Sequence, residues 1–218
     1  MLQPNSKSFA DWIHQFFGHA VTDPPWYCDL EADTSEPEPP ACVAHMVRLF
    51  EGPDVVLASY SDAQVNQGLW YLVGNACYSL IEPEVAWSQR RRGIRAITSL
   101  FEHLFARRCS DHLSHLDEVG ANPLNSVCYM WWDIFPWFGR PENPAYADLD
   151  TELLAVMRRI LTLDSLPCWE SALHGLGHWQ IYYPEVAQQA IAEFLERVGE
   201  VRLELREYAE RARQGLVL

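Results

Sequence analysis

Lysine is almost absent from this chain, and its acidic residues outnumber the basic ones. Of 218 residues, 16 are lysine or arginine and 30 are aspartate or glutamate, which gives a net charge of −14. Nucleic-acid backbones and anionic membranes repel such a surface, so we expect neither as a partner. A basic protein partner is favoured instead, because opposite charges speed the encounter of two proteins.

The six cysteines include no C-x-x-C pair and are widely spaced along the chain. This pattern argues against a cysteine zinc site and indicates buried free thiols in a reducing compartment. The N-terminal stretch lacks the charged start and apolar core of a secretory signal. No apolar run reaches the roughly 18 residues that a membrane span needs. We therefore expect a soluble, cytoplasmic protein.

Alternating, strand-like patterns are also scarce. The best strand candidate is VVLASY (55–60), which equally fits a short buried helix. Elsewhere apolar residues recur at steps of three and four, as in RAITSLFEHLFARR (95–108), TELLAVMRRIL (151–161) and EVAQQAIAEFLERV (185–198). This period is typical of amphipathic helices and predicts an all-α chain.

The tetrapeptide PEVA occurs twice, at residues 83–86 and 184–187. Each copy follows an aromatic stretch and precedes an amphipathic segment. The segments after the two copies also correspond, because RAITSLFEHL (95–104) and QAIAEFLERV (189–198) match in their apolar positions and in one glutamate. The match predicts a repeated structural unit.

Two weaker copies extend this repeat. One runs from SVCYMWWDIFPWFG (126–139) to TELLAVMRRIL (151–161), and the other from ACVAHMVRLF (41–50) to DVVLASYSD (54–62). Each unit is predicted to be two helices joined by a turn, and proline in the turns ends one helix and opens the next. Over residues 42–198 this pattern resembles the HEAT and armadillo class of helical repeats. The resemblance implies a short solenoid of irregular antiparallel helix pairs with the second helices on the concave face; a compact helical bundle is the alternative.

The N-terminal part differs in composition from the repeats. Residues 1–41 are predicted to contain a helix followed by the acidic, proline-rich loop DLEADTSEPEPP (29–40). The loop has no helical period and is expected to be exposed. We expect residues 1–41 to pack on or flank the core, and residues 42–218 to form the helical-repeat domain.

The motif LHGLGHW (173–179) places His174 and His178 four residues apart. On a helix this spacing puts both imidazoles on one face, where two of them can reach one metal ion. A third ligand would have to come from elsewhere, and His112 and His115 are candidates.

The two glycines of this motif, Gly175 and Gly177, weaken a helix by about 1 kcal/mol each relative to alanine. A close helix crossing gains from them, because a missing Cβ lets two backbones approach, whereas a metal site gains nothing. The motif also lacks the glutamate that acts as general base in H-E-x-x-H. We therefore favour helix packing without a metal or other cofactor, and a metal site at His174 and His178 is the alternative.

Aromatic residues are densest in YMWWDIFPWF (129–138). Its members cannot all face one way, so a core helix is favoured and a protein-binding surface through Trp131, Trp132 and Trp137 is the alternative. Asp133 lies among them and is expected to cap a helix or to pair, because a buried carboxylate needs a partner.

A basic cluster, QRRRGIR (89–95), stands out on this acidic chain. The guanidinium groups of Arg91 and Arg92 suit a phosphate or an acidic partner. The favoured interpretation is a solvated helix face, paired with the acidic loop of the same chain.

Taken together, these features favour a non-enzymatic, all-helical protein that binds another protein through an extended surface. Small acidic binders include inhibitors and immunity proteins that neutralise a toxin, and we hypothesise such a role against a basic partner. A metal-dependent hydrolase using His174 and His178 is the second hypothesis. A scaffold subunit bound through the tryptophan-rich segment is the third.

Overall fold

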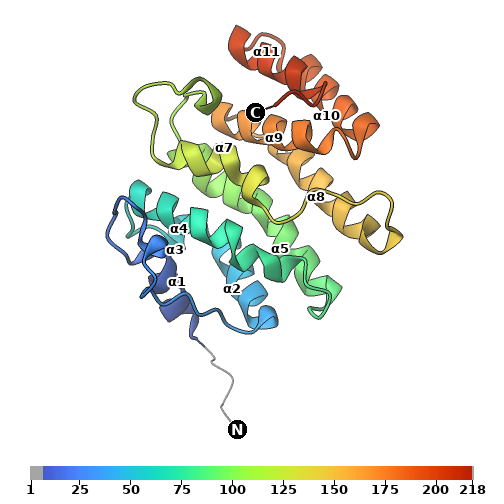
Figure 1. Cartoon of the computed structure of the whole chain (residues 1–218). Helices are drawn as coiled ribbons and strands as arrows, with labels where there is room; N and C mark the ends of the chain where they lie inside the picture. Colours follow the sequence, from blue (N-terminus) through green and yellow to red (C-terminus); the bar gives the residue numbers. More distant parts are fainter. Residues whose placement is uncertain (1–6, 218) are drawn as a thin grey trace.

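The computed structural model describes residues 7–217, and every regular element within this range is a helix (Figure 1). The all-α class predicted from the helical period is therefore confirmed. None of the described helices is both long enough and apolar enough to cross a bilayer. The α-helices are α1 (Phe9–Phe17), α2 (Pro39–Glu51), α3 (Pro53–Val56), α4 (Asp62–Gly74), α5 (Trp87–Leu100), α6 (Ala106–Arg108), α7 (Leu124–Ile134), α8 (Ala147–Ile160), α9 (Leu166–Trp179), α10 (Pro184–Val198) and α11 (Leu203–Ala212).

The longer helices form two rows that can be followed from the N-terminal to the C-terminal end of the molecule (Figure 1). In the first row α1, α4, α7, α9 and α11 each pack against the next. In the second row α2, α5, α8 and α10 do the same. Such neighbours occur in a short stack of helix pairs and also in a compact bundle of helices.

Local sequence signals explain where several helices begin. Proline occupies the first turn of α2, α9 and α10, where a backbone N–H would have no partner within the helix. A capping box opens α4: the Gln64 backbone N–H donates to the Ser61 hydroxyl, and the Ser61 backbone N–H donates to the Gln64 side chain.

In three of the four predicted units both segments are helical, as α4 and α5, α7 and α8, and α9 and α10. The prediction of a helix pair in the weakest copy, residues 41–50 and 54–62, is corrected. Its first segment is α2, which packs beside α5 in the second row, and α1 occupies the corresponding place in the first row. Its second segment forms only the single turn α3, and no strand occurs at residues 55–60. Pro53 stops α2, and Val55 is 78% exposed, so this stretch lacks a continuous apolar face.

The N-terminal helix lies against the rest of the chain. Phe16 and Phe17 of α1 are buried, and a Cβ added at Gly68 of α4 would lie 2.6 Å from the Phe16 carbonyl oxygen. This close approach requires glycine at position 68. The loop that follows is tied back to α1, because the Gln15 amide donates to the Asp33 carbonyl oxygen.

Candidate functional site

The two glycines of LHGLGHW lie where α9 meets its neighbours most closely. A Cβ added at Gly175 would lie 2.6 Å from Trp132 Cγ of α7 and 2.8 Å from Met157 Sδ of α8. A Cβ added at Gly177 would lie 2.6 Å from Val217 Cγ1. Real Cβ atoms essentially never make such short contacts. The predicted close helix crossing is therefore confirmed at Gly175, whereas Gly177 accommodates Val217, which lies after α11 and in no helix.

The tryptophans of the aromatic stretch are core residues rather than a docking surface. Trp131, Trp132 and Trp137 are 0%, 1% and 7% exposed. Trp131 and Trp132 are buried because α7 lies inside the first row, between α4 and α9. Trp137 follows α7 in the chain, and its indole N–H donates to Asp150 of α8. The alternative that these three side chains bind a partner protein is corrected accordingly, and only Phe138, at 42%, is exposed at the end of the stretch.

The side chain of Asp133 is not part of the aromatic core and lies beside the two histidines of α9. Its Oδ1 is 3.4 Å from His178 Nε2, and His178 Nε2 is 3.1 Å from His174 Nε2. The ligand atoms of these three residues all lie within 4.8 Å of one another. The crossing of α7 and α9 at Gly175 and Trp132 explains this placement, because Asp133 directly follows Trp132 in the chain.

The cluster has a buried end and a solvent-facing end. His174 is 1% exposed, whereas the side chains of His178 and Asp133 are 28% and 38% exposed. Burial, together with the neighbouring His178 and His115, lowers the pKa of His174 to about 3. His174 is therefore uncharged at neutral pH and has one ring nitrogen with a free lone pair.

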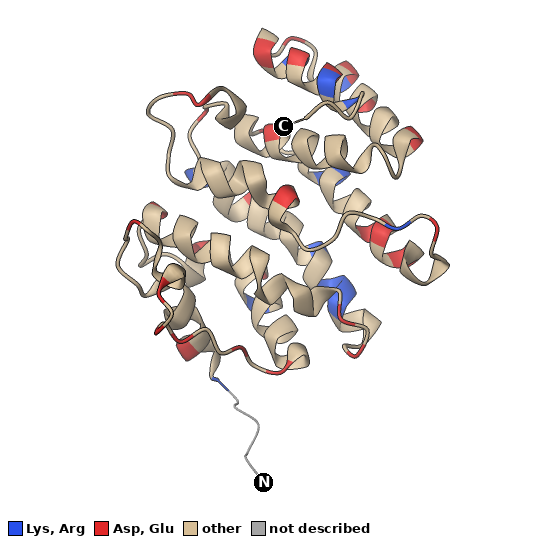
Figure 2. Cartoon of the chain, viewed as in Figure 1, with Lys and Arg blue, Asp and Glu red and all other residues tan. Residues whose placement is uncertain are grey.

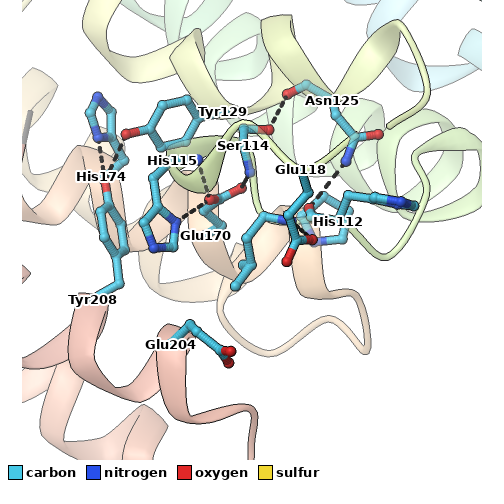
Figure 3. A network of polar contacts seen from close by, with 12 residues as sticks. His112, Ser114, His115, Glu118, Asn125, Tyr129, Glu170, His174, Glu204 and Tyr208 are labelled. Atoms are coloured by element: carbon cyan, nitrogen blue, oxygen red, sulfur yellow. Dashed lines mark hydrogen bonds and ion pairs between the residues drawn. The ribbon is translucent and has the colours of Figure 1, made fainter. Parts of the chain in front are cut away.

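At the buried end, two tyrosines contact His174 (Figure 3). The Tyr208 hydroxyl, from α11, is 2.6 Å from His174 Nδ1 and 3.1 Å from the Tyr129 hydroxyl of α7. The Tyr129 ring also packs on the His174 ring, with 4.4 Å between their centroids. Because Nδ1 is held in this hydrogen bond, Nε2 faces His178.

The third ligands suggested by the sequence, His112 and His115, do not join this cluster. His115 Nδ1 is instead 2.6 Å from Glu170 Oε1. Glu170, which is fully buried on α9, also accepts hydrogen bonds from the backbone N–H groups of Ser114 and His115 (Figure 3). Glu170 therefore anchors the loop before α7. The third candidate ligand beside His174 and His178 is Asp133.

Sequence reasoning missed Tyr129, Tyr208 and Glu170. The only available signal was the place of Tyr208 on the apolar stripe of α11, since a buried tyrosine hydroxyl needs a hydrogen-bond partner. That signal does not name the partner, because Tyr208 and His174 are 34 residues apart.

Three of the four arginines in the basic cluster pair with carboxylates of the same chain, whereas Arg90 donates to backbone carbonyl oxygens. Arg91 Nε is 2.6 Å from Glu152 of α8, and Arg92 makes two hydrogen bonds of 2.7 and 2.8 Å to Glu51 of α2. An internally paired helix face was expected here. However, the expected pairing with the acidic loop at 29–40 is wrong, because the partners of Arg91 and Arg92 come from α8 and α2.

Asp133, His174 and His178 are the residues that could hold a metal ion. Within residues 7–217, no other three histidine, cysteine or carboxylate side chains converge as closely. Imidazole and carboxylate ligands suit Zn²⁺, Fe²⁺ and other divalent first-row ions. Bonds of about 2.0–2.2 Å to one ion separate adjacent ligand atoms by about 3.0–3.5 Å. The contacts of 3.1 and 3.4 Å fall in this range.

Comparisons of the chain with protein-family models, curated proteins and solved structures find no match. The resemblance to HEAT and armadillo repeats therefore rests on the sequence pattern alone. The site is interpreted from its own geometry.

Proposed function

We propose that this chain is a metal-binding protein with an open mononuclear centre at Asp133, His174 and His178. The observation that carries the proposal is the convergence of two imidazole nitrogens and one carboxylate oxygen within 4.8 Å. Two of the separations, 3.1 and 3.4 Å, fall in the range expected between adjacent ligands of one divalent ion, and the third is within 4.8 Å. Because His174 is uncharged at neutral pH, it need not lose a proton to the solvent before binding.

The ligand number favours a reactive centre over a purely structural one. Structural zinc sites are closed by four protein ligands, whereas catalytic sites use three and leave a position for water or substrate. The exposure of His178 and Asp133 leaves this open position on the solvent side. Two histidines and one carboxylate are also the ligand set of mononuclear zinc hydrolases and of non-haem iron enzymes.

Hydrolysis is the reaction class that we assign to this centre. A bound Zn²⁺ lowers the pKa of a coordinated water to about 7 and so supplies hydroxide at neutral pH. The residue after His174 is glycine, so the chain has no glutamate at the position of the H-E-x-x-H base. The reaction would depend on the metal for activation of water, and a carbonyl or phosphoryl compound is the substrate class.

Metal titration of the purified protein tests the proposal. We expect metal-free protein to bind one Zn²⁺ per chain by calorimetry, and we expect Asp133→Asn and His178→Ala to weaken binding by at least about 100-fold. Both positions are partly exposed, so both variants should fold. His14→Ala, at an exposed position of α1, is the matched control and should bind like the original chain. If Zn²⁺, Fe²⁺, Mn²⁺ and Co²⁺ all fail to bind, the proposal is wrong.

Activity separates the hydrolase assignment from metal binding alone. At the same Zn²⁺ concentration, the original chain and His14→Ala should cleave an activated ester or phosphodiester faster than Asp133→Asn, and chelation should abolish the difference. If the protein binds the metal but cleaves neither class of substrate, the proposed metal centre stands and the assignment as a hydrolase is wrong.

As a second candidate function, we propose binding of a basic protein by the segment between α1 and α2. Asp23, Asp29, Glu31 and Glu38 are exposed on this segment, and Figure 2 shows acidic positions along it. Such a surface attracts a basic-surfaced partner by long-range electrostatics. An inhibitor or immunity protein that covers the active site of a toxin is the specific form of this proposal.

Charge neutralisation tests this second candidate. A variant with amides at the four exposed acidic positions (Asp23→Asn, Asp29→Asn, Glu31→Gln and Glu38→Gln) should lose a basic partner that the original chain retains at low salt. Inhibition of that partner's activity by the original chain, and not by the variant, would support the inhibitor role. Equal retention of the partner by both proteins would contradict it.

A further inference from the structure

The C-terminal helix α11 supplies a side chain to the buried end of the proposed metal centre. Tyr208 is 2% exposed, and its hydroxyl has two partners, His174 Nδ1 at 2.6 Å and the Tyr129 hydroxyl at 3.1 Å (Figure 3). Its ring is also stacked on the His115 ring, with 4.2 Å between centroids. The position of the hydroxyl is therefore fixed by packing as well as by hydrogen bonds.

The hydrogen-bond directions follow from counting protons. A neutral imidazole carries one proton, so His174 must hold it on Nδ1 when Nε2 binds a metal ion. The Nδ1–H group then donates to the Tyr208 oxygen. The Tyr208 hydroxyl keeps its own proton, which it can donate to the Tyr129 oxygen at 3.1 Å. The metal-bound state consequently leaves neither His174 Nδ1 nor the Tyr208 hydroxyl buried without a partner.

We infer that Tyr208 is a positioning residue of the metal centre, and that metal binding is thereby coupled to the docking of α11 on α9. This inference rests on the proposed metal-binding function. Outer-shell partners that hold a ligating histidine through its second nitrogen fix its tautomer and orientation, and their loss weakens metal binding by about 10–100-fold.

Helix α11 lies at the end of the first row, where it packs on α9 and α10 (Figure 1). Among the described residues, the helices that it packs against most are these two. Leu205, Ala209 and Ala212 form its buried face, together with Tyr208. When α11 opens, Tyr208 leaves His174 and the centre loses its outer-shell partner. By thermodynamic reciprocity, a bound metal must oppose this opening by the same factor.

Zinc titration and hydrogen exchange together test this coupling. The proteins are the original chain, Tyr208→Phe, and Tyr78→Phe as a control at an exposed tyrosine. Each is titrated with Zn²⁺ against a competing chelator, and amide exchange of residues 203–212 is followed by mass spectrometry with and without Zn²⁺. Circular dichroism confirms that each variant is folded.

We expect Tyr208→Phe to bind Zn²⁺ about 10–100-fold more weakly and Tyr78→Phe to bind normally. In the original chain, Zn²⁺ should slow exchange in α11 by a similar factor, whereas in Tyr208→Phe this effect should vanish. A structural role of Tyr208 alone would destabilise α11 but would not remove the response of α11 to Zn²⁺.

The opposing outcomes are distinct. If the original chain binds Zn²⁺ but the amide exchange of α11 is the same with and without Zn²⁺, the proposed coupling is wrong and the proposed metal centre stands. Equal Zn²⁺ affinity in the original chain and Tyr208→Phe also overturns the inference alone. If the original chain binds no metal, the proposed function fails and this inference fails with it. If Tyr208→Phe does not fold, the exchange response of the original chain still decides.

Discussion

Tyr208 contacts one histidine from each of two histidine–carboxylate clusters, His115 and His174, and the two clusters differ in burial and hydrogen bonding. His115 and Glu170 form a closed pair: Glu170 is fully buried and accepts three hydrogen bonds from the loop before α7. His178 and Asp133 form an open pair at 3.4 Å, with side chains 28% and 38% exposed. The same residue types therefore serve as an anchor in one place and as a candidate metal centre in the other.

The two roles are distinguished by how completely the carboxylate is already hydrogen-bonded. The Glu170 oxygens accept hydrogen bonds from two backbone N–H groups and from the His115 ring. Few of their lone pairs are therefore available to bind an ion. Asp133 faces one imidazole nitrogen and solvent. A buried carboxylate with a full set of donors stabilises a fold, whereas a partly exposed one remains available to a ligand.

Removing the carboxylate charge should separate the two clusters most clearly. We expect Glu170→Gln to lower the free energy of unfolding by about 3 kcal/mol, because it disrupts a fully buried hydrogen-bond network. Asp133→Asn should change the free energy of unfolding by less than about 1 kcal/mol, because its side chain is partly solvated. Urea unfolding of metal-free protein measures both values. Equal losses would contradict the distinction between anchor and open site.

The second-largest effect is expected from filling the space at the crossing of α7 and α9, beside the open cluster. Gly175→Ala would push a Cβ against Trp132, and we expect a loss of about 2 kcal/mol of unfolding free energy despite the higher helix propensity of alanine. It should also weaken Zn²⁺ binding, because Trp132 precedes Asp133. Gly177→Ala is the matched control: it meets only the Val217 side chain, so its loss should be smaller. A harmless Gly175→Ala would contradict the packing account.

The smallest expected effect concerns the exposed pair that ties the anchored loop to α11. The Arg202 guanidinium and the Leu113 backbone N–H hold the pKa of Glu118 at about 2, below the value of about 4.3 in an unfolded chain. A lowered carboxyl pKa contributes stability above about pH 4.3, and this contribution is lost as pH falls through about 2.

Thermal unfolding of Glu118→Gln checks this pH dependence. The melting temperature of the variant should be about 1–2 °C lower than that of the original chain at pH 6, because exposed ion pairs contribute little. The difference should shrink towards pH 2. A difference that is constant over this range would show that Glu118 acts through packing rather than charge.

Much of the helical framework was predictable from residues that act locally. The three- and four-residue apolar period, the prolines of the turns and the repeated PEVA indicated the pairs α4–α5 and α9–α10. The glycines at 175 and 177 also indicated a close crossing, because only glycine lacks a Cβ. The place of α1 beside α4 at the end of the first row was missed, because this segment lacks the repeat's pattern.

The candidate site was predictable only in part, because it depends on contacts distant in sequence. The four-residue spacing of His174 and His178 was visible. Their third partner was not, since Asp133 reaches them only through the crossing of α7 and α9 at Trp132. His115 was an equally reasonable candidate until the structure placed it on Glu170. The local sequence pattern does not distinguish a carboxylate whose oxygens accept hydrogen bonds from backbone N–H groups from one whose oxygens remain available to a ligand.

Anomalous X-ray scattering from crystals grown with Zn²⁺ tests the central claim most directly. The account predicts one peak at the zinc edge, bonded at about 2.0–2.2 Å to His174 Nε2, His178 Nε2 and an oxygen of Asp133. The same soak of Asp133→Asn crystals should show a weaker peak or none. A zinc-edge map with no peak beside these three residues, while zinc is present elsewhere in the same crystal, would contradict the account.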